Sequence, residues 1–213
     1  TFTSTKPIQA HIVSGDTGST YELRWYSLIP REKWAKSYIS PVGDTKGESK
    51  ILIYNPNSSS IKVRIQKKTG YDEEWISSKN CGYTSYIPDG TGAEVKWLSG
   101  GGSGEFLAFS VTDTQGSNQL YDWGFPLMPT DMLTSQVLIG WGYGCTGNSC
   151  TCTGSFCGNG ATDRSVVWVT PVTDATIYAD YNNDGIVDRT VSASRLECVK
   201  FTDGDMDMSG AVI

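Results

Sequence analysis

Apolar and polar residues alternate along most of the chain in short runs, and no run of any length shows a helical period. Each run is bounded by Gly, Pro, Asn or Asp, which is the pattern of strands joined by turns. The expected strands cover residues 7–13, 21–26, 50–54, 61–66, 92–98, 105–112, 136–142, 166–170, 176–181 and 198–202. This density of short strands predicts an all-β chain of antiparallel β-sandwiches of the Ig-like or Greek-key kind.

The strands recur in two similar sets, which predicts an internal repeat. In residues 50–63 an apolar strand leads to a proline, a polar turn and a second strand, and residues 165–178 follow the same plan. Upstream of each set, residues 10–30 and 108–129 share the order Ala, strand, Trp and Pro. Chance similarity between β-rich segments is the alternative explanation.

The 213 residues are enough for one large domain or two small ones. We expect an N-terminal strand at residues 1–13, a first sandwich at 14–110 and a second sandwich at 111–213. The second sandwich would carry a cysteine-rich insertion at 145–157 and a metal loop at 180–188.

The candidate metal loop has the sequence DYNNDGIVD, with oxygen-bearing side chains at positions 1, 3, 5 and 9 and glycine at position 6. A hard cation such as Ca²⁺ takes ligands from these positions and from the carbonyl at position 7, and the glycine permits a sharp turn. The expected ligands are Asp180, Asn182, Asp184, the Ile186 carbonyl and Asp188.

Position 12 of this loop is Val191, so the bidentate Glu of a helical EF-hand is missing and strand-like runs flank the loop instead. The alternative is a solvated hairpin turn that holds no ion. A second candidate metal group is formed by Asp203, Asp205 and Asp207, although no glycine stands at its sixth position.

Six cysteines are present, and four of them lie within residues 145–157 without a common zinc spacing or a nearby histidine. Disulfides in an oxidising compartment are therefore the favoured interpretation, which predicts an extracellular or cell-surface location. The pairing stays open, although one intervening residue makes a bridge between Cys150 and Cys152 unfavourable. The six are Cys81, Cys145, Cys150, Cys152, Cys157 and Cys198.

The net charge is −6 and the pI about 4.8, which argues against nucleic acid or anionic lipid as a partner. No apolar run approaches the roughly 18 residues that span a bilayer, so membrane insertion is not expected. His11 is the single histidine, and neither a nucleophile elbow nor a phosphate-binding loop is present. We therefore expect a protein that is not an enzyme.

The sequence has TKPIQA at residues 5–10 and DMSGA at residues 207–211. These segments, with SVVWVTP at 165–171 and the following metal loop, resemble the repeats of IgGFc-binding-protein-like domains in large bacterial surface proteins. The resemblance implies a scaffold or binding role and brings no catalytic residues. In the family order a Lys-Pro strand follows the Ser-Gly-Ala segment within one sandwich.

The predicted function is therefore a structural repeat unit of an extracellular bacterial surface protein or fibre, stabilised by Ca²⁺ and disulfides. Its expected partners are other copies, joined head to tail, or adjacent repeats. Residues 3–13 would add a strand beside residues 198–213 of a neighbour and bury Ile8, Ala10 and Ile12. Pairing of both ends within one molecule is an alternative. The alternative function is a carbohydrate- or ligand-binding adhesin module that uses exposed Trp and Tyr.

Overall fold

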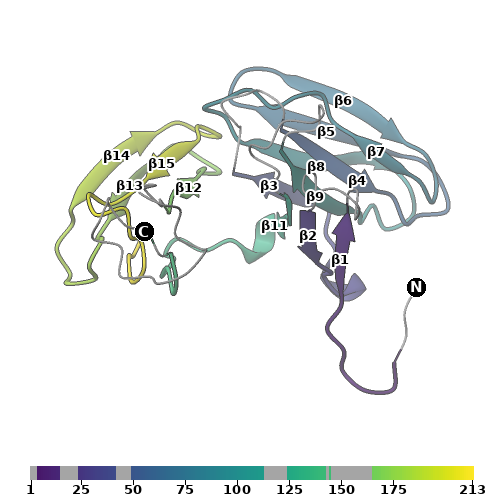
Figure 1. Cartoon of the computed structure of the whole chain (residues 1–213). Coiled ribbons are helices and arrows are strands. Elements are labelled where there is room, and N and C mark those ends of the chain that lie inside the picture. Colours follow the sequence, from purple (N-terminus) through teal and green to yellow (C-terminus); the bar gives the residue numbers. More distant parts are fainter. Residues whose placement is uncertain (1–3, 15–23, 42–48, 113–123, 143, 145–164) are drawn as a thin grey trace. The chain divides into compact units, whose positions relative to one another are not determined.

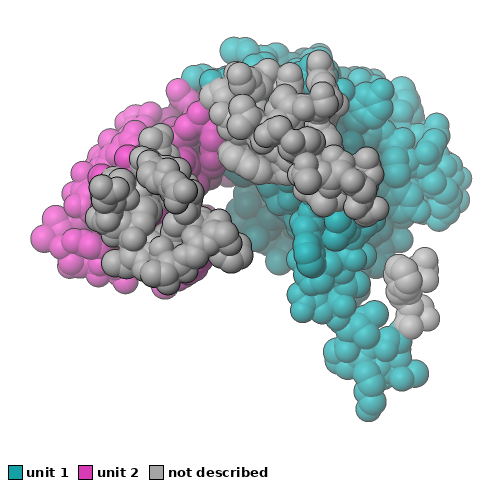
Figure 2. Space-filling view, viewed as in Figure 1, with its two compact units in different colours: residues 1–133 teal, residues 134–213 magenta. Residues whose placement is uncertain are grey.

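A computed structural model of the chain describes residues 4–14, 24–41, 49–112, 124–142, 144 and 165–213. Within these residues the regular structure is antiparallel β, apart from two 3-10 turns, η1 (Arg31–Lys33) and η2 (Thr130–Met132). The all-β prediction is thus confirmed. The chain forms two compact units, Thr1–Leu133 and Thr134–Ile213, which Figure 2 distinguishes by colour.

The first unit contains two main sheets and one hairpin (Figure 1). One sheet has the order β10-β9-β4-β7, the other has the order β11-β3-β8-β5-β6, and β1 pairs with β2. The strands are β1 (His11–Ser14), β2 (Arg24–Ser27), β3 (Ser37–Ser40), β4 (Lys50–Tyr54), β5 (Ile61–Lys67), β6 (Tyr71–Ile76), β7 (Cys81–Tyr83), β8 (Ala93–Gly100), β9 (Leu107–Val111), β10 (Gly124–Pro126) and β11 (Met128–Pro129).

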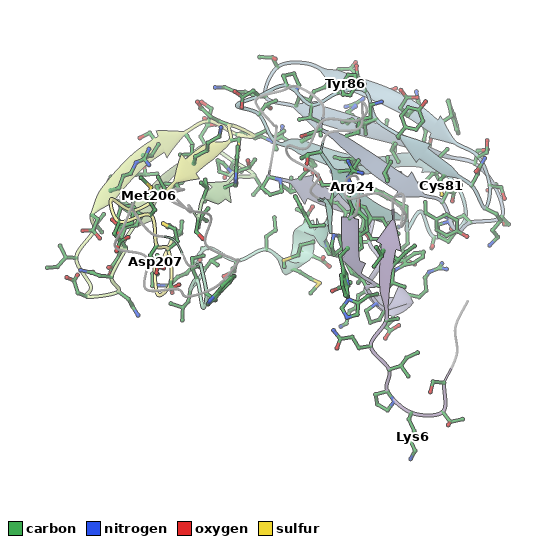
Figure 3. All side chains as sticks on the ribbon, in the orientation of Figure 1. Lys6, Arg24, Cys81, Tyr86, Met206 and Asp207 are labelled. Carbon is green, nitrogen blue, oxygen red and sulfur yellow. The ribbon has the colours of Figure 1, made fainter. Side chains whose placement is uncertain are left out.

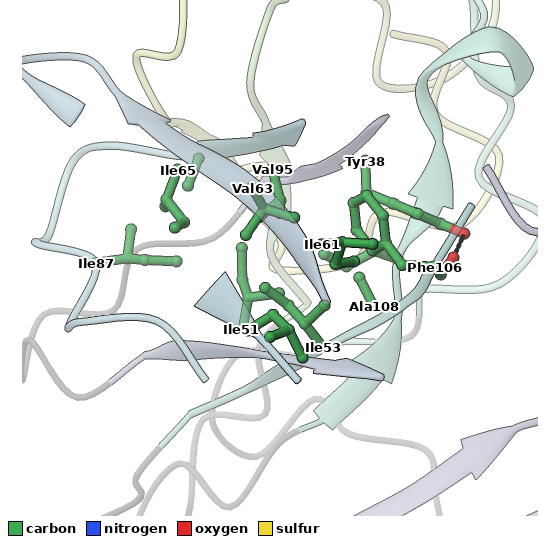
Figure 4. Packing of buried hydrophobic residues seen from close by; sticks show 13 residues of the cluster. Tyr38, Ile51, Ile53, Ile61, Val63, Ile65, Ile87, Val95, Phe106 and Ala108 are labelled. Atoms are coloured by element: carbon green, nitrogen blue, oxygen red, sulfur yellow. Dashed lines mark hydrogen bonds between the residues drawn. The ribbon is translucent and has the colours of Figure 1, made fainter. Parts of the chain in front are cut away.

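The two sheets share one apolar core (Figure 4). In β5, Ile61, Val63 and Ile65 are fully buried, whereas the intervening Lys62 and Arg64 are only half-buried. This alternation places every second side chain of the strand in the core, as the two-residue period of a strand requires. The facing sheet contributes its own inward residues, including those of β4 and β9, so the unit is a β-sandwich.

Tyr38 on β3 belongs to this core and carries a buried polar group, its hydroxyl. Its hydroxyl donates to the Phe106 carbonyl oxygen at 2.6 Å and accepts from the Ala35 amide at 2.8 Å. Burial raises the pKa of Tyr38 to about 12 because the low-dielectric core disfavours the phenolate. These bonds tie the residues before β3 to those before β9.

The second unit contains short strands as well. Its strands are β12 (Val167–Val169), β13 (Ala175–Ala179), β14 (Arg189–Ala193) and β15 (Val199–Phe201), which pair as β12-β15 and β13-β14. Val212 bridges to Leu138 on one side and to Asp180 on the other. A separate core gathers the residues Ile177, Ala179, Ala193, Phe201, Met208 and Ala211.

The compact units divide at residues 133 and 134, later than the predicted boundary at 110 and 111. The reason is that β10 pairs with β9 and β11 pairs with β3, so residues 124–129 belong to the sheets of the first unit. Both strands are very short and contain proline, which hides them from an alternation pattern.

We predict that Tyr38→Phe destabilises the protein by about 1–3 kcal/mol, because the Ala35 amide and the Phe106 carbonyl lose a buried partner. Chemical denaturation measures the change. Tyr83→Phe is the matched control, since Tyr83 is exposed and its loss should stay within about 0.5 kcal/mol. Equal effects of the two substitutions would contradict a structural role for the Tyr38 hydroxyl.

Candidate metal loop and N-terminal hairpin

The candidate metal loop connects the two strands of the β13-β14 hairpin. The ladder ends at the pair Ala179↔Arg189, and the Asp188 amide donates to the Ala179 carbonyl at 2.9 Å. Residues 180–188 therefore form one hairpin loop, flanked by strands as the sequence predicted. Its side chains are mostly exposed.

Two carboxylates organise the turn inside this loop. Asp180 accepts from the amides of Asp184 at 3.2 Å and Gly185 at 2.8 Å. Asp184 in turn accepts from the Ile186 amide at 2.8 Å. Gly185 has φ of 85°, a left-handed conformation that favours glycine, so the residue expected at position 6 is used as the sequence suggested.

The remaining expected ligands lie on the same loop. The Asn182 side chain donates to Asp184 Oδ2 at 3.1 Å, which brings residues 180, 182 and 184 around one turn. Asp188 accepts from the Tyr181 amide at 2.7 Å, at the neck of the loop. Carboxylate, amide and carbonyl oxygens of this kind suit a hard cation such as Ca²⁺.

Over the described residues, no three His, Cys, Asp or Glu side chains are grouped so as to hold a metal by themselves. An ion in this loop would therefore also need the Asn182 side chain and the Ile186 carbonyl, which are ligand types outside that set. The loop contains the oxygen donor types that calcium prefers.

The second acidic group shows a different arrangement. Asp205 accepts from the Asp207 amide at 2.9 Å, and Asp207 accepts from the Ser209 amide at 2.7 Å. Hydrogen bonds from Ser209 lower the pKa of Asp207 below its ordinary value, with a smaller contribution from the Gly144 amide. Each of these carboxylates accepts a hydrogen bond from the backbone amide two residues later in the sequence. Such bonds stabilise turns.

Two cysteines fall in the part of the chain that the structure describes. Cys81 is an exposed free thiol on β7 (Figure 3), and Cys198 is half-buried just before β15. No disulfide joins these two residues. The other four predicted disulfide cysteines, Cys145, Cys150, Cys152 and Cys157, lie outside the described residues.

The expected assembly strand begins later than predicted, because β1 starts at His11 and pairs with β2. Residues 4–9 are exposed and carry no strand, and Lys6 lies on this segment (Figure 3). Of the three predicted assembly residues, Ile8 is 60% exposed, Ile12 is 47% exposed and Ala10 is half-buried. Two apolar side chains of this segment are therefore available on the surface.

The β1-β2 hairpin is attached to the first sandwich through β2. Tyr26 is buried and packs edge-on against Phe109 with ring centroids 4.9 Å apart, and Arg24 donates to the Thr112 carbonyl at 2.7 Å. Between the hairpin and the outer face of the β9-β4-β7 sheet lies an apolar pocket of about 440 Å³. Its lining includes Ile12, Tyr26, Leu52, Tyr54, Tyr83 and Phe109.

His11 lies on the β1-β2 hairpin and contacts its second strand. Its Nδ1 lies 3.2 Å from the Ser27 hydroxyl, and its ring meets Trp25 edge-on across the hairpin. The exposed tryptophans of the described residues, Trp25, Trp75 and Trp141, lie on different elements of the chain.

Sequence reasoning missed that β2 shares the apolar face of β1. Ile12 pairs directly with Tyr26, and Leu28, which is partly exposed, donates to the Ala10 carbonyl. The sequence does contain a sign of this second strand, because LIP at residues 28–30 is similar to LMP at residues 127–129. That similarity extends the repeated pattern from the first strand of each hairpin to the second.

Comparison with known proteins finds no family model, no curated protein and no solved structure that matches this chain. Among the described residues, no helix has the length and apolar character needed to cross a membrane.

Proposed function

We propose that this chain is a non-enzymatic structural module of an extracellular bacterial surface protein or fibre. In this proposal its two units are repeats of one Ig-like or Greek-key sandwich plan. Calcium and disulfides stabilise the module, and copies join head to tail by β-strand addition. The observation that carries the proposal is that the ladders of the second unit have counterparts in the first.

The order of the paired segments is similar in the two units. In the first unit Glu94 pairs with Ile39 and with Gln66, so β8 lies between β3 and β5. In the second unit Val212 pairs with Leu138 and with Asp180, so residues 211–213 lie between residues 137–139 and the β13-β14 hairpin. Likewise, β4 pairs with β7 as β12 pairs with β15.

The turns agree as well. Lys79 and Leu196 have φ of 55° and 61°, and each stands two residues before a cysteine. The amide after each donates back three residues, from Asn80 to Ser77 at 3.3 Å and from Glu197 to Ser194 at 2.9 Å. Positive φ is uncommon for residues other than glycine. Its recurrence before Cys81 and Cys198 supports a common origin for the two hairpin connections.

The prolines that precede η1 and η2 both lie in the first unit and show a repeat within that unit. Pro30 has φ of −53° and ψ of 141°, and Pro129 has φ of −53° and ψ of 142°. The repeated architecture is typical of a scaffold.

The alternative function, a carbohydrate- or ligand-binding adhesin module, draws support from the apolar pocket under the hairpin. Three tyrosines and Phe109 contribute to its lining, and aromatic side chains offer flat apolar faces to a sugar ring. A glycan array and the quenching of tryptophan fluorescence distinguish this function from a purely structural one.

Calcium binding in the 180–188 loop predicts a gain in stability. With a dissociation constant near 10⁻⁴ M and about 1 mM free ion, binding adds roughly 1.4 kcal/mol. Wild type should therefore melt several degrees higher in millimolar calcium than in chelator, and Asp184→Ala should remove this rise.

Asp174→Ala is the control for the calcium experiment, because Asp174 also accepts a backbone bond, from Arg195, but lies outside the loop. It should lower the melting temperature while keeping the calcium-dependent rise. Identical melting of wild type in calcium and in chelator would refute a stabilising ion.

Head-to-tail association predicts a concentration-dependent size distribution in solution. Light scattering and sedimentation should show a ladder of oligomers for the full chain, since a heterologous contact propagates instead of closing. Removal of residues 1–13 should reduce the ladder to monomers while leaving the first sandwich folded.

The matched control for this deletion replaces residues 1–13 with a Gly-Ser segment of equal length, which should also be monomeric. A full-length chain that stays monomeric at high concentration would contradict the proposed assembly.

A further inference from the structure

The β1-β2 hairpin reproduces the β9-β10 hairpin in register. Ile12 pairs with Tyr26 as Ser110 pairs with Phe125. At the next step, the Leu28 amide donates to the Ala10 carbonyl at 2.9 Å, and the Leu127 amide donates to the Ala108 carbonyl at 3.0 Å. Both hairpins lead into a proline and a 3-10 turn. The two hairpins are thus the same structural element.

In the first unit, β9-β10 completes the sandwich. The strand β9 occupies the edge of β4 opposite β7, with Ile51 paired to Ser110 and Ile53 paired to Ala108. The apolar face of this hairpin is consequently closed from water. Its members Phe106, Ala108, Ser110 and Leu127 are at most 1% exposed.

The corresponding face of β1-β2 is largely uncovered. Ile8, Ile12 and Leu28 occupy the positions of Phe106, Ser110 and Leu127, and their exposures are 60%, 47% and 36%. Tyr26 of this face is buried against the first sandwich, and Ile12 lines the pocket beside it. The hairpin therefore has an apolar face suited to a sandwich edge of the β4 type.

The second unit offers such an edge at β12. This strand is the counterpart of β4, because each pairs with the strand that follows the cysteine turn and each sends alternate apolar residues to its core. Those residues are Ile51 and Ile53 in β4, and Val167 and Val169 in β12. Within the described residues β12 pairs with β15 alone, so its other edge carries no strand there.

We propose that the β1-β2 hairpin of one copy docks on the edge of β12 opposite β15, which carries no strand among the described residues, in the second unit of another copy. The inference rests on the proposed head-to-tail assembly and identifies its acceptor. Transferring the β4-β9 register places Ile12 opposite Val167 and Ala10 opposite Val169, with antiparallel pairing. His11 then lies opposite Trp168 on the outer face.

This acceptor differs from the one expected from sequence, residues 198–213. The backbone of Ile213 already exchanges bonds with Val137 at 2.8 and 2.9 Å, and Val212 exchanges bonds with Asp180 at 3.0 and 2.8 Å. Residues 211–213 thus have a neighbour on both sides and leave no edge for a further strand. In the first unit the β9-β10 hairpin pairs with the edge of β4. The matching edge in the second unit belongs to β12, the counterpart of β4.

A disulfide trap tests the register. Directly opposite residues of an antiparallel pair have Cα atoms about 4.5–5.5 Å apart, within the range of a disulfide. The test protein carries His11→Cys and Trp168→Cys in a Cys81→Ser background. Isotopically labelled and unlabelled copies are mixed and oxidised, and mass spectrometry identifies the linked peptides and whether they come from different copies. Wild type receives the same treatment for comparison.

The control pair is His11→Cys with Thr190→Cys. It places the acceptor thiol on β14, which pairs only with β13 among the described residues and so offers a different edge. We expect a link between residues 11 and 168 of different copies at least tenfold more abundant than the 11–190 link. Ile8→Asp should reduce the 11–168 link at least tenfold, and Gln9→Asp, one residue along, should reduce it far less.

Oligomers that form without the 11–168 link, or with an equal 11–190 link, would overturn this acceptor and leave the proposed assembly standing. A link confined to single copies would show that the hairpin docks within its own chain and would also overturn the inference. Monomers alone, without any link, would overturn the inference together with the proposed assembly.

Discussion

The first unit depends on β4 having a strand on each of its edges. With β7 on one side and β9 on the other, its backbone groups are paired and Ile51 and Ile53 face the opposite sheet. An edge left without a strand would expose unpaired amides and carbonyls beside an apolar core, which is costly and invites pairing with another chain. The strand that closes this edge comes from residues 107–111, which lie far from β4 in the sequence.

The candidate metal loop is subject to a different constraint, because it concentrates negative charge in a short connection between two strands. Asp180, Asp184 and Asp188 carry three carboxylates on one exposed loop, and their repulsion is offset only in part by amide donors within the loop. Screening by water and salt moderates this repulsion at an exposed site. A bound divalent cation would remove more of it, which is why the proposed effect of calcium is on the stability of this hairpin.

Much of this fold could be predicted from sequence where a strand buries one face. The alternation in β5 and the Asx-Gly turn at Asp184-Gly185 identify their elements directly. In contrast, β10 and β11 contain Pro126 and Pro129 and are set by pairing with distant strands, so no local pattern predicts them. The spacing alone predicts a loop at residues 180–188, but the orientation of Asp188 toward the Tyr181 amide depends on how the hairpin folds.

Charge explains why strand addition would favour one edge over another. The edge strand β6 carries Asp72, Glu73 and Glu74, and hydrogen bonds from Lys67 to Asp72 and from Lys62 and Arg64 to Glu73 lower the pKa of the two carboxyls. Ionised side chains on an edge disfavour docking of an apolar strand. The strands β1 and β12, with sequences HIVS and VWV, carry no acidic or lysine side chain. The proposed contact therefore joins two strands that lack this protection, a feature they share with β7, β10, β11 and β13.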